Sequence, residues 1–232
     1  MPKPAVAIFV KTPSLSPVKT RLASDLGTGW AEEFHRRAAA TVAAVVRSTE
    51  VVLAPYWAVA EHAALEHPAW SGFPTLWQGG GGLGIRMHRI YARLQQDHGR
   101  VLLLGADTPQ ITSKLLRQAL DALEQAETPF VIGPARDGGF WLFGGRLPLP
   151  TPTWTSVRYS WPNTALQLMR KIAPLGGMAR LETQVDADTI EDLAFVRAAL
   201  AILPEPVSAQ RELCTWLEAV NLTTVPSEDA EP

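Results

Sequence analysis

The sequence predicts an α/β protein, a three-layer α/β/α sandwich around a mostly parallel mixed sheet. Short, continuously apolar segments, typical of strands buried on both faces, alternate with amphipathic helical segments. The most regular apolar segment, residues 101–107, ends in a carboxylate, Asp107. A glycine run at residues 79–82 separates an earlier strand from a helix, as in loops whose backbone approaches a ligand closely. These observations indicate a ligand crevice at the carboxyl ends of the strands.

The length and composition fit one domain. The 232 residues are 47% hydrophobic and 19% charged, which is enough for one sizeable core. We therefore expect a single domain at residues 1–222 and a disordered acidic tail at residues 223–232. The formal net charge of -2 gives no reason to expect nucleic acid as a partner.

Cysteine usage and hydropathy indicate a location. The single Cys214 excludes an internal disulfide framework, which suits a reducing cytoplasm. No stretch reaches the roughly 18 apolar residues of a membrane span, and the apolar run at residues 5–10 lacks the features of a signal peptide. We expect a cytoplasmic protein without a membrane span, and the sequence leaves its oligomeric state open.

The elements of the first half follow from hydrophobic periodicity. Residues 5–10 predict the first strand, and a proline-containing cationic loop at residues 11–22 follows it. Apolar residues at helical spacing predict a crossover helix at residues 29–48. The later elements are expected as strands at residues 51–54 and 75–78, a short helix at 61–67, a helix at 83–96 and the strand at 101–107.

The second half breaks the alternation of strands and helices. Thr112 is a good N-cap for a helix at residues 113–125, and a strand–turn–strand pattern at residues 130–143 predicts an antiparallel pair. Asp188 with Glu191 is placed like a capping box for a helix that follows a strand end. Two more helices are expected, one after residue 160 with Leu166, Met169 and Ile172 inward, and one at residues 207–220 with Cys214 buried.

Carboxylates at strand ends are the candidate metal ligands. Asp107 emerges at the crevice end of its strand, where its oxygen atoms suit the Mg²⁺ or Mn²⁺ that accompanies a nucleotide. Asp186 and Asp188 form a second acidic pair, and either one could complete the site. The alternatives are that Asp107 caps the next turn and that Asp188 caps a helix.

Cations gather in the loop after the first strand. Lys11, Lys19 and Arg21 have no carboxylate near them in sequence until Asp25, so we expect Lys19 and Arg21 to contact phosphate. Arg86, in the first helical turn behind the glycines, is the next candidate. The alternative is that these charges are merely solvated.

A second glycine-containing turn, Asp137-Gly138-Gly139, could close over a ligand, or it could be an Asx-turn without a ligand. Catalytic motifs of other classes are missing from the sequence. The five histidines are scattered without metal-site spacing, and no GxSxG elbow occurs.

The glycine run also matches a dinucleotide fingerprint, which keeps an NAD(P)-binding protein among the hypotheses. Gly79-x-Gly81-x-x-Gly84 follows a strand, opens a helix and precedes Asp107 by about twenty residues. The fingerprint normally lies after the first strand, however, and here the first strand carries the cationic loop.

Together these motifs resemble one bacterial family. In order, they are Lys11-x-Pro13 with Val18-Lys19-Thr20-Arg21-Leu22, Gly81-x-Leu83-Gly84-x-Arg86-Met87, Gly105-x-Asp107-x-Pro109, Gly133-Pro134 with Asp137-Gly138-Gly139-Phe140, and Val185-Asp186-x-Asp188-Thr189. The chain resembles the radical SAM/selenodomain-associated glycosyltransferases, type 1, over about residues 5–200. The Lys-Thr-Arg-Leu and Gly-x-Asp-x-Pro motifs are also similar to those of 2-phospholactate and molybdenum-cofactor guanylyltransferases.

The resemblance implies the Rossmann-like type A glycosyltransferase fold of the nucleotide-diphospho-sugar transferase superfamily. It implies a Mg²⁺-dependent transferase whose donor is a nucleoside triphosphate or a nucleotide sugar and whose small-molecule acceptor is unknown. The implied catalytic residues are Lys19, Arg21 and Asp107, and Asp186 or Asp188 would be the second metal ligand. The remaining expected contacts are Lys11, Gly81, Gly84 and Arg86 with the nucleotide, and Asp137, Gly138 and Gly139 with the acceptor.

One departure from the family pattern keeps a different hypothesis open. The family usually has Gly-Asp-Leu-Gly, and this chain has Gly81-Gly82-Leu83-Gly84, so an acid is missing. A nucleotide-binding protein with little or no turnover is therefore the second hypothesis. The sequence does not choose between glycosyl and nucleotidyl transfer, although the cationic loop favours the more highly charged triphosphate.

Overall fold

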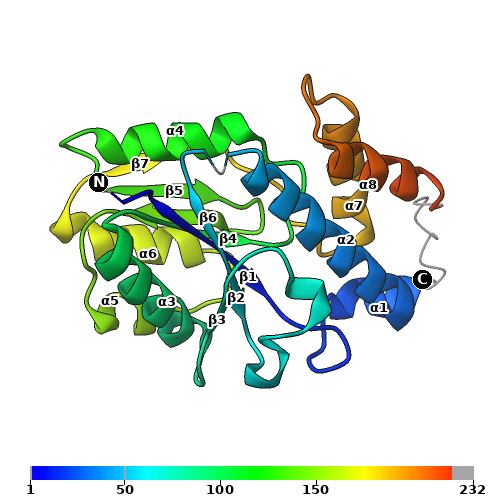
Figure 1. Cartoon of the computed structure of the whole chain (residues 1–232), viewed down its shortest axis with the longest axis horizontal. Coiled ribbons are helices and arrows are strands. Elements are labelled where there is room, and N and C mark those ends of the chain that lie inside the picture. Colours follow the sequence, from blue (N-terminus) through cyan, green and yellow to red (C-terminus); the bar gives the residue numbers. More distant parts are fainter. Residues whose placement is uncertain (1, 50, 221–232) are drawn as a thin grey trace, which may run out of the picture.

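A seven-stranded sheet forms the centre of the computed structural model, which describes residues 2–49 and 51–220 (Figure 1). The strand order is β3-β2-β1-β4-β6-β5-β7. Only β6 runs antiparallel to its neighbours, which confirms the mostly parallel mixed sheet and the antiparallel pair. The strands are β1 Ala5–Val10, β2 Ala54–Val59, β3 Thr75–Trp77, β4 Val101–Gly105, β5 Phe130–Pro134, β6 Phe140–Gly145 and β7 Met178–Arg180.

Helices cover both faces of the sheet, so the predicted three layers are present. Helices α2 and α4 lie on one face, and α3, α5 and α6 lie on the other (Figure 1). Their bounds, with those of the remaining helices, are α1 Thr20–Leu26, α2 Thr28–Arg47, α3 Leu83–His98, α4 Ser113–Glu124, α5 Thr151–Thr155, α6 Thr164–Ile172, α7 Ile190–Ala201 and α8 Ser208–Glu218. The described residues also form three short 3-10 helices, η1 His62–Ala64, η2 Pro68–Trp70 and η3 Ala173–Leu175.

Strand β1 connects the two cores because its side chains alternate between the faces of the sheet. Val6 and Ile8 pack into the core under α2 and α4, whereas Ala5 and Ala7 pack into the core under α3 and α6. All four side chains are fully buried. Burial on both faces explains why this strand is apolar throughout instead of alternating with polar residues.

The strand order reverses direction between β1 and β4. From β1 the chain passes through α1 and α2 to β2 on one side, and from β4 it passes through α4 to β5 on the other side. The loops after β1 and β4 therefore diverge at the carboxyl ends of two adjacent parallel strands. Such a switch point leaves a crevice in which open α/β sheets bind ligands.

Strand β2 starts at Ala54, the residue at which the strand predicted at residues 51–54 ends. Val51 lies in a turn after α2 with 86% of its surface exposed, so the prediction of a strand at residues 51–54 is wrong. Pro55 is tolerated near the start of β2 because β3 pairs only from Trp57 onward, which leaves the position of Pro55 without a partner on that side.

Two predictions for the C-terminal half are shifted. The capping box of α7 consists of Thr189 and Asp192, one residue beyond the predicted pair of Asp188 and Glu191. In α6, Leu166 is 46% exposed, so its predicted inward orientation is wrong, and Leu168 is buried instead. The shift of the cap leaves the Asp188 carboxylate available for another partner.

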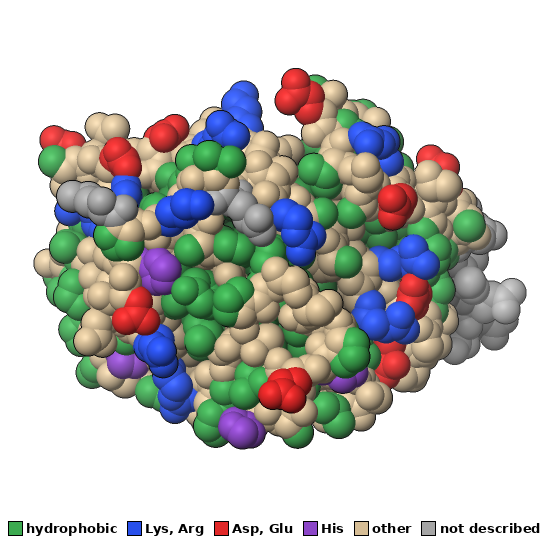
Figure 2. Space-filling model, viewed as in Figure 1, with side chains coloured by type: hydrophobic (Ala, Val, Ile, Leu, Met, Phe, Trp, Pro, Cys, Tyr) green, Lys and Arg blue, Asp and Glu red, His purple; other side chains and the backbone are tan. Residues whose placement is uncertain are grey.

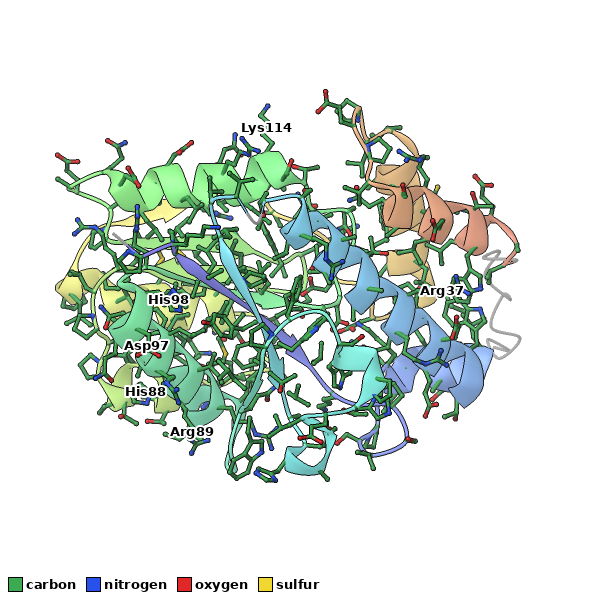
Figure 3. All side chains as sticks on the ribbon, viewed as in Figure 1. Arg37, His88, Arg89, Asp97, His98 and Lys114 are labelled. Carbon is green, nitrogen blue, oxygen red and sulfur yellow. The ribbon has the colours of Figure 1, made fainter. Side chains whose placement is uncertain are left out.

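Other local predictions are confirmed. Thr112 caps α4 by accepting a hydrogen bond from the amide of Leu115, and Cys214 is buried in α8. His98 at the end of α3 is structural, since its ring nitrogens contact the Lys3 carbonyl and the Tyr56 hydroxyl (Figure 3). The predicted disordered tail at residues 223–232 lies outside the described residues.

The outer surface carries both signs of charge. On the face shown in Figure 2, Lys and Arg side chains are interspersed with Asp and Glu side chains and with apolar patches. Within residues 2–49 and 51–220, no helix is long and apolar enough to cross a membrane.

Candidate active site

The carboxyl ends of β1 and β4 open into a cleft made of two adjoining cavities. We call the first the polar half, a cavity of about 520 Å³ whose lining includes Lys11, Lys19, Arg86, Asp107 and Asp188. We call the second the aromatic half, a cavity of about 300 Å³ whose lining includes Phe140, Tyr159, Trp161, Asp137 and Asp186. Asp107 lines both cavities, so it stands where they meet.

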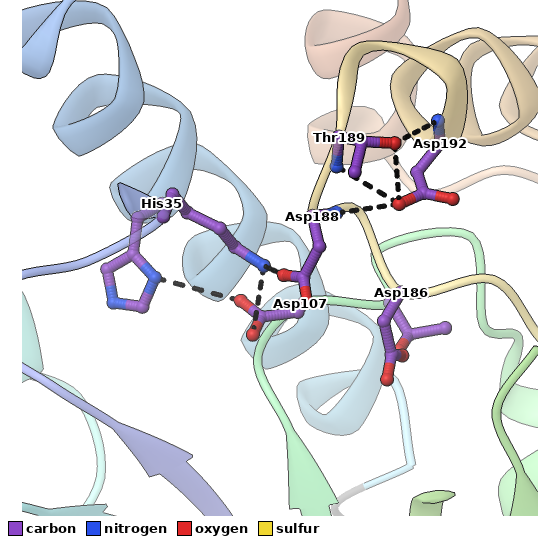
Figure 4. Close-up of polar contacts among 8 residues, drawn as sticks. His35, Asp107, Asp186, Asp188, Thr189 and Asp192 are labelled. Atoms are coloured by element: carbon purple, nitrogen blue, oxygen red, sulfur yellow. Dashed lines mark hydrogen bonds and ion pairs between the residues drawn. The ribbon is translucent and has the colours of Figure 1, made fainter. Parts of the chain in front are cut away.

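Lys19 is the centre of the polar half. Its ammonium group lies 2.8 Å from Oδ1 of Asp188 and 3.0 Å from Oδ2 of Asp107, and its side chain is only 3% exposed (Figure 4). Burial alone would lower the pKa of Lys19, but the two carboxylates raise it above its ordinary value. The ammonium group is therefore charged at neutral pH and held from two sides.

The backbone of Lys19 is itself unusual. Lys19 is the N-cap of α1 and adopts left-handed angles, with φ 47° and ψ 47°. A residue with a Cβ atom rarely adopts this conformation, and strain of this kind often accompanies a functional constraint. Here the conformation turns the chain at the end of the cationic loop and carries the lysine side chain into the cleft.

Asp107 keeps its charge in a confined position. Burial favours its neutral form, but the Lys19 ammonium, joined by the His35 ring when that ring is protonated, outweighs this and lowers the pKa of Asp107 below its ordinary value. The Oδ1 atom of Asp107 is buried and accepts no hydrogen bond from the described residues. An ionised oxygen without a donor is available to a ligand that supplies positive charge.

The sequence analysis missed His35, which reaches the cleft from α2. Its Nε2 lies 2.9 Å from the Lys11 carbonyl oxygen, which can only accept, so Nε2 carries the proton. Its Nδ1 faces Oδ1 of Asp107 at 3.7 Å, a contact that becomes an ion pair only when the ring is protonated. A lone histidine within a helix gives no sequence signal for this position.

The two C-terminal acids serve different halves of the cleft. Asp188 binds Lys19 in the polar half, whereas Asp186 lines the aromatic half and accepts a hydrogen bond from the Thr108 hydroxyl (Figure 4). Burial raises the pKa of Asp186 to about 7, the Thr108 hydrogen bond opposes this rise, and the negative charge of Asp107 adds to it. Asp186 therefore changes charge near neutral pH.

The glycine turn borders the polar half. Gly79 and Gly81 have φ values of 80° and 97°, which confirms the expected need for glycine, and the Gly81 carbonyl accepts a hydrogen bond from Arg86 Nε at 2.8 Å. Arg89, which the sequence analysis did not single out, donates to the Gln78 carbonyl and so fastens the turn to α3 (Figure 3).

Three predicted residues lie outside the cavity linings. Arg21 is exposed on α1, and Gly84 is buried where α3 meets α5, with the Trp154 carbonyl oxygen 2.5 Å from the position of an added Cβ. Gly138 packs against the Pro162 carbonyl oxygen with φ 89°. Of the turn after β5, Asp137 and Gly139 line the aromatic half, and Asp137 Oδ1 accepts a hydrogen bond from the Gly139 amide at 2.8 Å.

Buried amides hold the segments that carry the acids. Gln210 of α8 donates to the carbonyl oxygens of Pro109 and Ile111 at 2.9 and 2.8 Å, and Gln110 donates to the Val185 carbonyl at 2.7 Å. The Ala187 amide also donates to the Asp107 carbonyl at 3.0 Å. The loops of Asp107 and Asp186 are thus fixed to each other and to α8.

The fold and cleft define the class of the protein, which has the nucleotide-diphospho-sugar transferase fold. It is similar to a protein from Desulfovibrio desulfuricans G20 that is provisionally named a nucleotide-diphospho-sugar transferase, with a TM-score of 0.82, 24% identity and coverage of 94% of this chain and 96% of that chain. It is also similar to 4-diphosphocytidyl-2C-methyl-D-erythritol synthase from Anaerococcus prevotii DSM 20548, with a TM-score of 0.55, 12% identity and coverage of 86% and 96%. A cytidylyltransferase from Leptospira borgpetersenii serovar Hardjo-bovis gives a TM-score of 0.51 and 13% identity, with 94% of each chain covered.

The chain belongs to the family described as "uncharacterized protein conserved in bacteria (DUF2064)", which it matches over residues 24–161. Comparison with curated proteins gave no match. The matched segment contains Asp107 and the glycine turn, whereas Lys19, Asp186 and Asp188 lie outside it. The cleft is therefore formed by the matched segment together with residues that precede and follow it.

Proposed function

We propose that the protein is a nucleotide-dependent transferase that binds a nucleoside triphosphate or a nucleotide sugar in the polar half of the cleft. The observation that carries this proposal is the buried Lys19 ammonium, fixed between Asp107 and Asp188 at the switch point of the sheet. A buried lysine at this point offers a fixed positive charge to a phosphate group. The fold shared with a cytidylyltransferase supports the same class of reaction.

The charges of the polar half favour a nucleotide that arrives with a metal ion. Its lining has three cations, Lys11, Lys19 and Arg86, against the carboxylates of Asp107 and Asp188, which leaves one net positive charge when His35 is neutral. A diphosphate or triphosphate carries more negative charge than this surplus can balance. A divalent cation bound with the phosphates would remove the difference.

The carboxylates of the cleft could supply one or two of the ligands that such an ion requires. Within the described residues, no group of three or more His, Cys, Asp or Glu side chains is arranged to hold a metal ion. Mg²⁺ requires only one or two protein carboxylates when water and phosphate oxygens supply the rest. Asp107, with its unpartnered buried Oδ1 atom, would be one ligand, and Asp186 or Asp188 the second. The bound ion would neutralise charge that develops on the leaving phosphate.

The residues of the chain would act by positioning and charge stabilisation. Lys19 and Arg86 would hold the phosphates, and exposed Arg21 on α1 would contribute only if the α1 region closes over the donor. The acceptor hydroxyl oxygen forms a bond to the transferred phosphorus or anomeric carbon while the bond to pyrophosphate or nucleoside diphosphate breaks. The electron pair leaves with that group, and the hydroxyl proton passes to solvent or to a carboxylate of the cleft.

Glycosyl and nucleotidyl transfer remain alternatives within this proposal. The two cations of the β1 loop that line the polar half, Lys11 and Lys19, favour a triphosphate and hence nucleotidyl transfer. The family resemblance inferred from the motifs favours glycosyl transfer. We place the reaction in the cytoplasm on the grounds given by the sequence.

The experiment that tests the proposal is calorimetric titration with nucleoside triphosphates and nucleotide sugars, with and without Mg²⁺. One or more of them should bind in a Mg²⁺-dependent manner, and Asp107→Asn should weaken that binding about 10–100-fold because a charged ligand group is lost. The matched control is Asp97→Asn, which removes an exposed acid paired with Arg93 on α3 (Figure 3). Nucleotide binding whose affinity is changed neither by removal of Mg²⁺ nor by Asp107→Asn would contradict the proposed mechanism.

Two further hypotheses give different results. A non-catalytic nucleotide-binding protein would bind a nucleotide without ever consuming it in the presence of cell extract. An NAD(P)-binding protein would be stabilised more by NAD or NADP than by any triphosphate in a thermal-shift assay. The GxGxxG pattern follows β3, an edge strand, whereas the dinucleotide fingerprint normally follows the first strand of a βαβ unit, and this favours the transferase.

A further inference from the structure

The aromatic half of the cleft has a charge pattern opposite to that of the polar half. Its lining contains the three carboxylates of Asp107, Asp137 and Asp186 and no Lys, Arg or His side chain. Lys19 neutralises Asp107 from the polar half. Within the described part of the chain, Asp137 and Asp186 form no ion pair with any cation.

The cations nearest to this cavity in sequence are directed elsewhere. The Arg136 guanidinium lies 4.3 Å from the centre of the Phe195 ring, and the Arg158 guanidinium lies 5.6 Å from the centre of the Trp161 ring. Neither arginine lines the cavity. A phosphate or carboxylate group in this cavity would therefore lie beside the carboxylates of a lining that includes no cationic side chain.

The hydroxyl groups of the lining are also poor partners for an anion. Tyr159 donates its hydroxyl hydrogen to the Trp154 carbonyl at 3.1 Å, and the Thr164 hydroxyl faces the carbonyl oxygens of Arg158 and Trp161 at 2.9 and 2.8 Å. The Ser160 hydroxyl also belongs to the lining, and the backbone of Ser160 has φ 61°. The lining of the cavity thus consists mainly of hydrogen-bond acceptors and aromatic surface and has few hydrogen-bond donors.

Aromatic side chains and unpaired carboxylates together recognise cations. Phe9, Phe140, Tyr159 and the 54% exposed Trp161 form the walls of the cavity and its rim. The faces of such rings carry partial negative charge, and they bind ammonium groups most strongly when water is excluded. Asp137 uses one oxygen within the protein, for the Gly139 amide, which leaves its second oxygen for a ligand. Asp186 uses one oxygen for the Thr108 hydroxyl, and its second oxygen is available to an amine where Asp188 is the second metal ligand.

We propose that the aromatic half binds an acceptor molecule that carries a positively charged amine, and that it discriminates against acceptors that carry phosphate or carboxylate. This inference rests on the proposed function only in naming the ligand an acceptor, because the donor would occupy the adjoining polar half. A cavity of about 300 Å³ holds a small ligand, of the size of one ring with a short side chain.

The test uses three probes of nearly equal shape and different charge, namely tyramine, tyrosol and 4-hydroxyphenylacetate. Their dissociation constants are measured by ligand-observed NMR titration against the full chain. We expect tyramine to bind about tenfold more tightly than 4-hydroxyphenylacetate, with tyrosol between them. Equal binding of the three, tighter binding of the anion, or no binding at millimolar concentration would overturn the proposal.

A matched pair of variants locates the effect. Asp137→Asn keeps a side-chain oxygen that can accept the Gly139 hydrogen bond, so the turn is retained while the charge is removed. This variant should reduce the preference for tyramine over 4-hydroxyphenylacetate several-fold, and Asp97→Asn should leave it unchanged. An unchanged preference in Asp137→Asn would overturn the assignment of the amine to this cavity.

Titration of the same samples with Mg²⁺ and nucleoside triphosphates separates the two proposals. If a triphosphate binds and the three probes show no charge preference, the proposed function stands and the amine site is rejected. If the probes follow the expected order and no nucleotide binds, the amine site stands and the proposed function is rejected.

Discussion

The two halves of the cleft are held together by different forces. In the polar half, one ammonium group joins two carboxylates at 2.8 and 3.0 Å. In the aromatic half, aromatic rings line the same cavity as Asp137 and Asp186, which have no ion-pair partner among the described residues. The polar half is therefore fixed before a ligand arrives, and each of its charges depends on the others. The aromatic half depends on shape and on whether Asp186 holds a proton.

This comparison distinguishes two kinds of pH response. In the polar half, Lys19 and Asp107 favour each other's charged forms, so their ion pair persists over a wide pH range around neutrality. In the aromatic half, burial favours the neutral form of Asp186, whose pKa is raised to about 7. The charge of the aromatic half consequently varies near neutral pH, whereas the Lys19–Asp107 ion pair of the polar half persists.

The largest effect on stability is expected from Lys19→Met. The variant leaves Asp107 and Asp188 close together without the cation between them, at positions whose side chains are 38% and 44% exposed. Removing one partner of a fully buried pair destabilises by about 3–5 kcal/mol, and partial exposure reduces this to about 1–3 kcal/mol. Urea unfolding at pH 7 measures the change, with Lys114→Met on the exposed face of α4 as the control (Figure 3).

The pH dependence of that variant follows from the lowered pKa of Asp107. A carboxyl group with a lowered pKa in the folded state stabilises the protein above its ordinary pKa, and this stabilisation is lost as the pH falls. The gap between wild type and Lys19→Met should therefore narrow below about pH 4. A gap that stays constant down to pH 3 would show that the ion pairs do not cause it.

Asp186→Asn is expected to change the stability of the protein less than Lys19→Met does, and to raise it instead of lowering it. Because the pKa of Asp186 is raised to about 7, the folded protein retains a proton that the unfolded chain has released. The wild type should thus lose stability as the pH rises from about 4 to 7, whereas the variant should not. With EDTA present, we expect similar melting temperatures at pH 5 and a variant that melts several degrees higher at pH 8.

The amide oxygen introduced by Asp186→Asn can still accept the hydrogen bond from Thr108, so this variant changes the charge with little change in shape. Asp97→Asn serves again as the exposed control. If Asp186→Asn melts below the wild type at pH 8, the carboxylate is stabilising in its charged form and the contrast between the halves fails.

The smallest effect is expected from Gly82→Asp, which restores the acid of the family pattern. Gly82 has φ -68° and ψ 167°, open to any residue, and a Cβ there would meet no atom within 4 Å. As N-cap of α3, an aspartate should add a few tenths of a kcal/mol of stability and strengthen Mg²⁺-dependent nucleotide binding. Thermal unfolding and calorimetry measure the two effects.

Two neighbouring variants control this experiment. Gly82→Ala separates loss of glycine from gain of the carboxylate. Gly84→Ala places a Cβ 2.5 Å from the Trp154 carbonyl oxygen and should destabilise the protein by about 1–3 kcal/mol. A Gly82→Asp protein that is less stable than the wild type would show that position 82 cannot accommodate the family's acid.

The polar half was largely predictable from the sequence. Asp107 follows a buried strand and Lys19 lies in the loop after the first strand, and parallel strands bring such loops to one edge of the sheet. Asp188 was a candidate there as one of an acidic pair. The pairing of Lys19 with Asp188 was not predictable, because a capping role already explained Asp188. The actual cap, Thr189, differs from the expected one by a single position.

The aromatic half was not predictable in the same way. Its rings come from positions 9, 140, 159 and 161, and nothing in their spacing distinguishes them from ordinary core residues. Phe9 illustrates the difficulty, since the same strand places Ile8 in the core and Phe9 beside the cavity. Tertiary contacts, rather than local sequence pattern, assemble this half of the cleft.

The Gln210 side chain makes the structure of the cleft depend on helix α8, near the C-terminus of the chain. Its two amide hydrogens bind the carbonyl oxygens on either side of Gln110, in the loop that begins with Asp107. A polypeptide translated only to residue 207, or cut there by a protease, would keep every residue of the cavity linings and lose the hydrogen bonds of Gln210. Such a fragment would carry a complete set of site residues and would lack the two hydrogen bonds by which α8 holds the loop after Asp107.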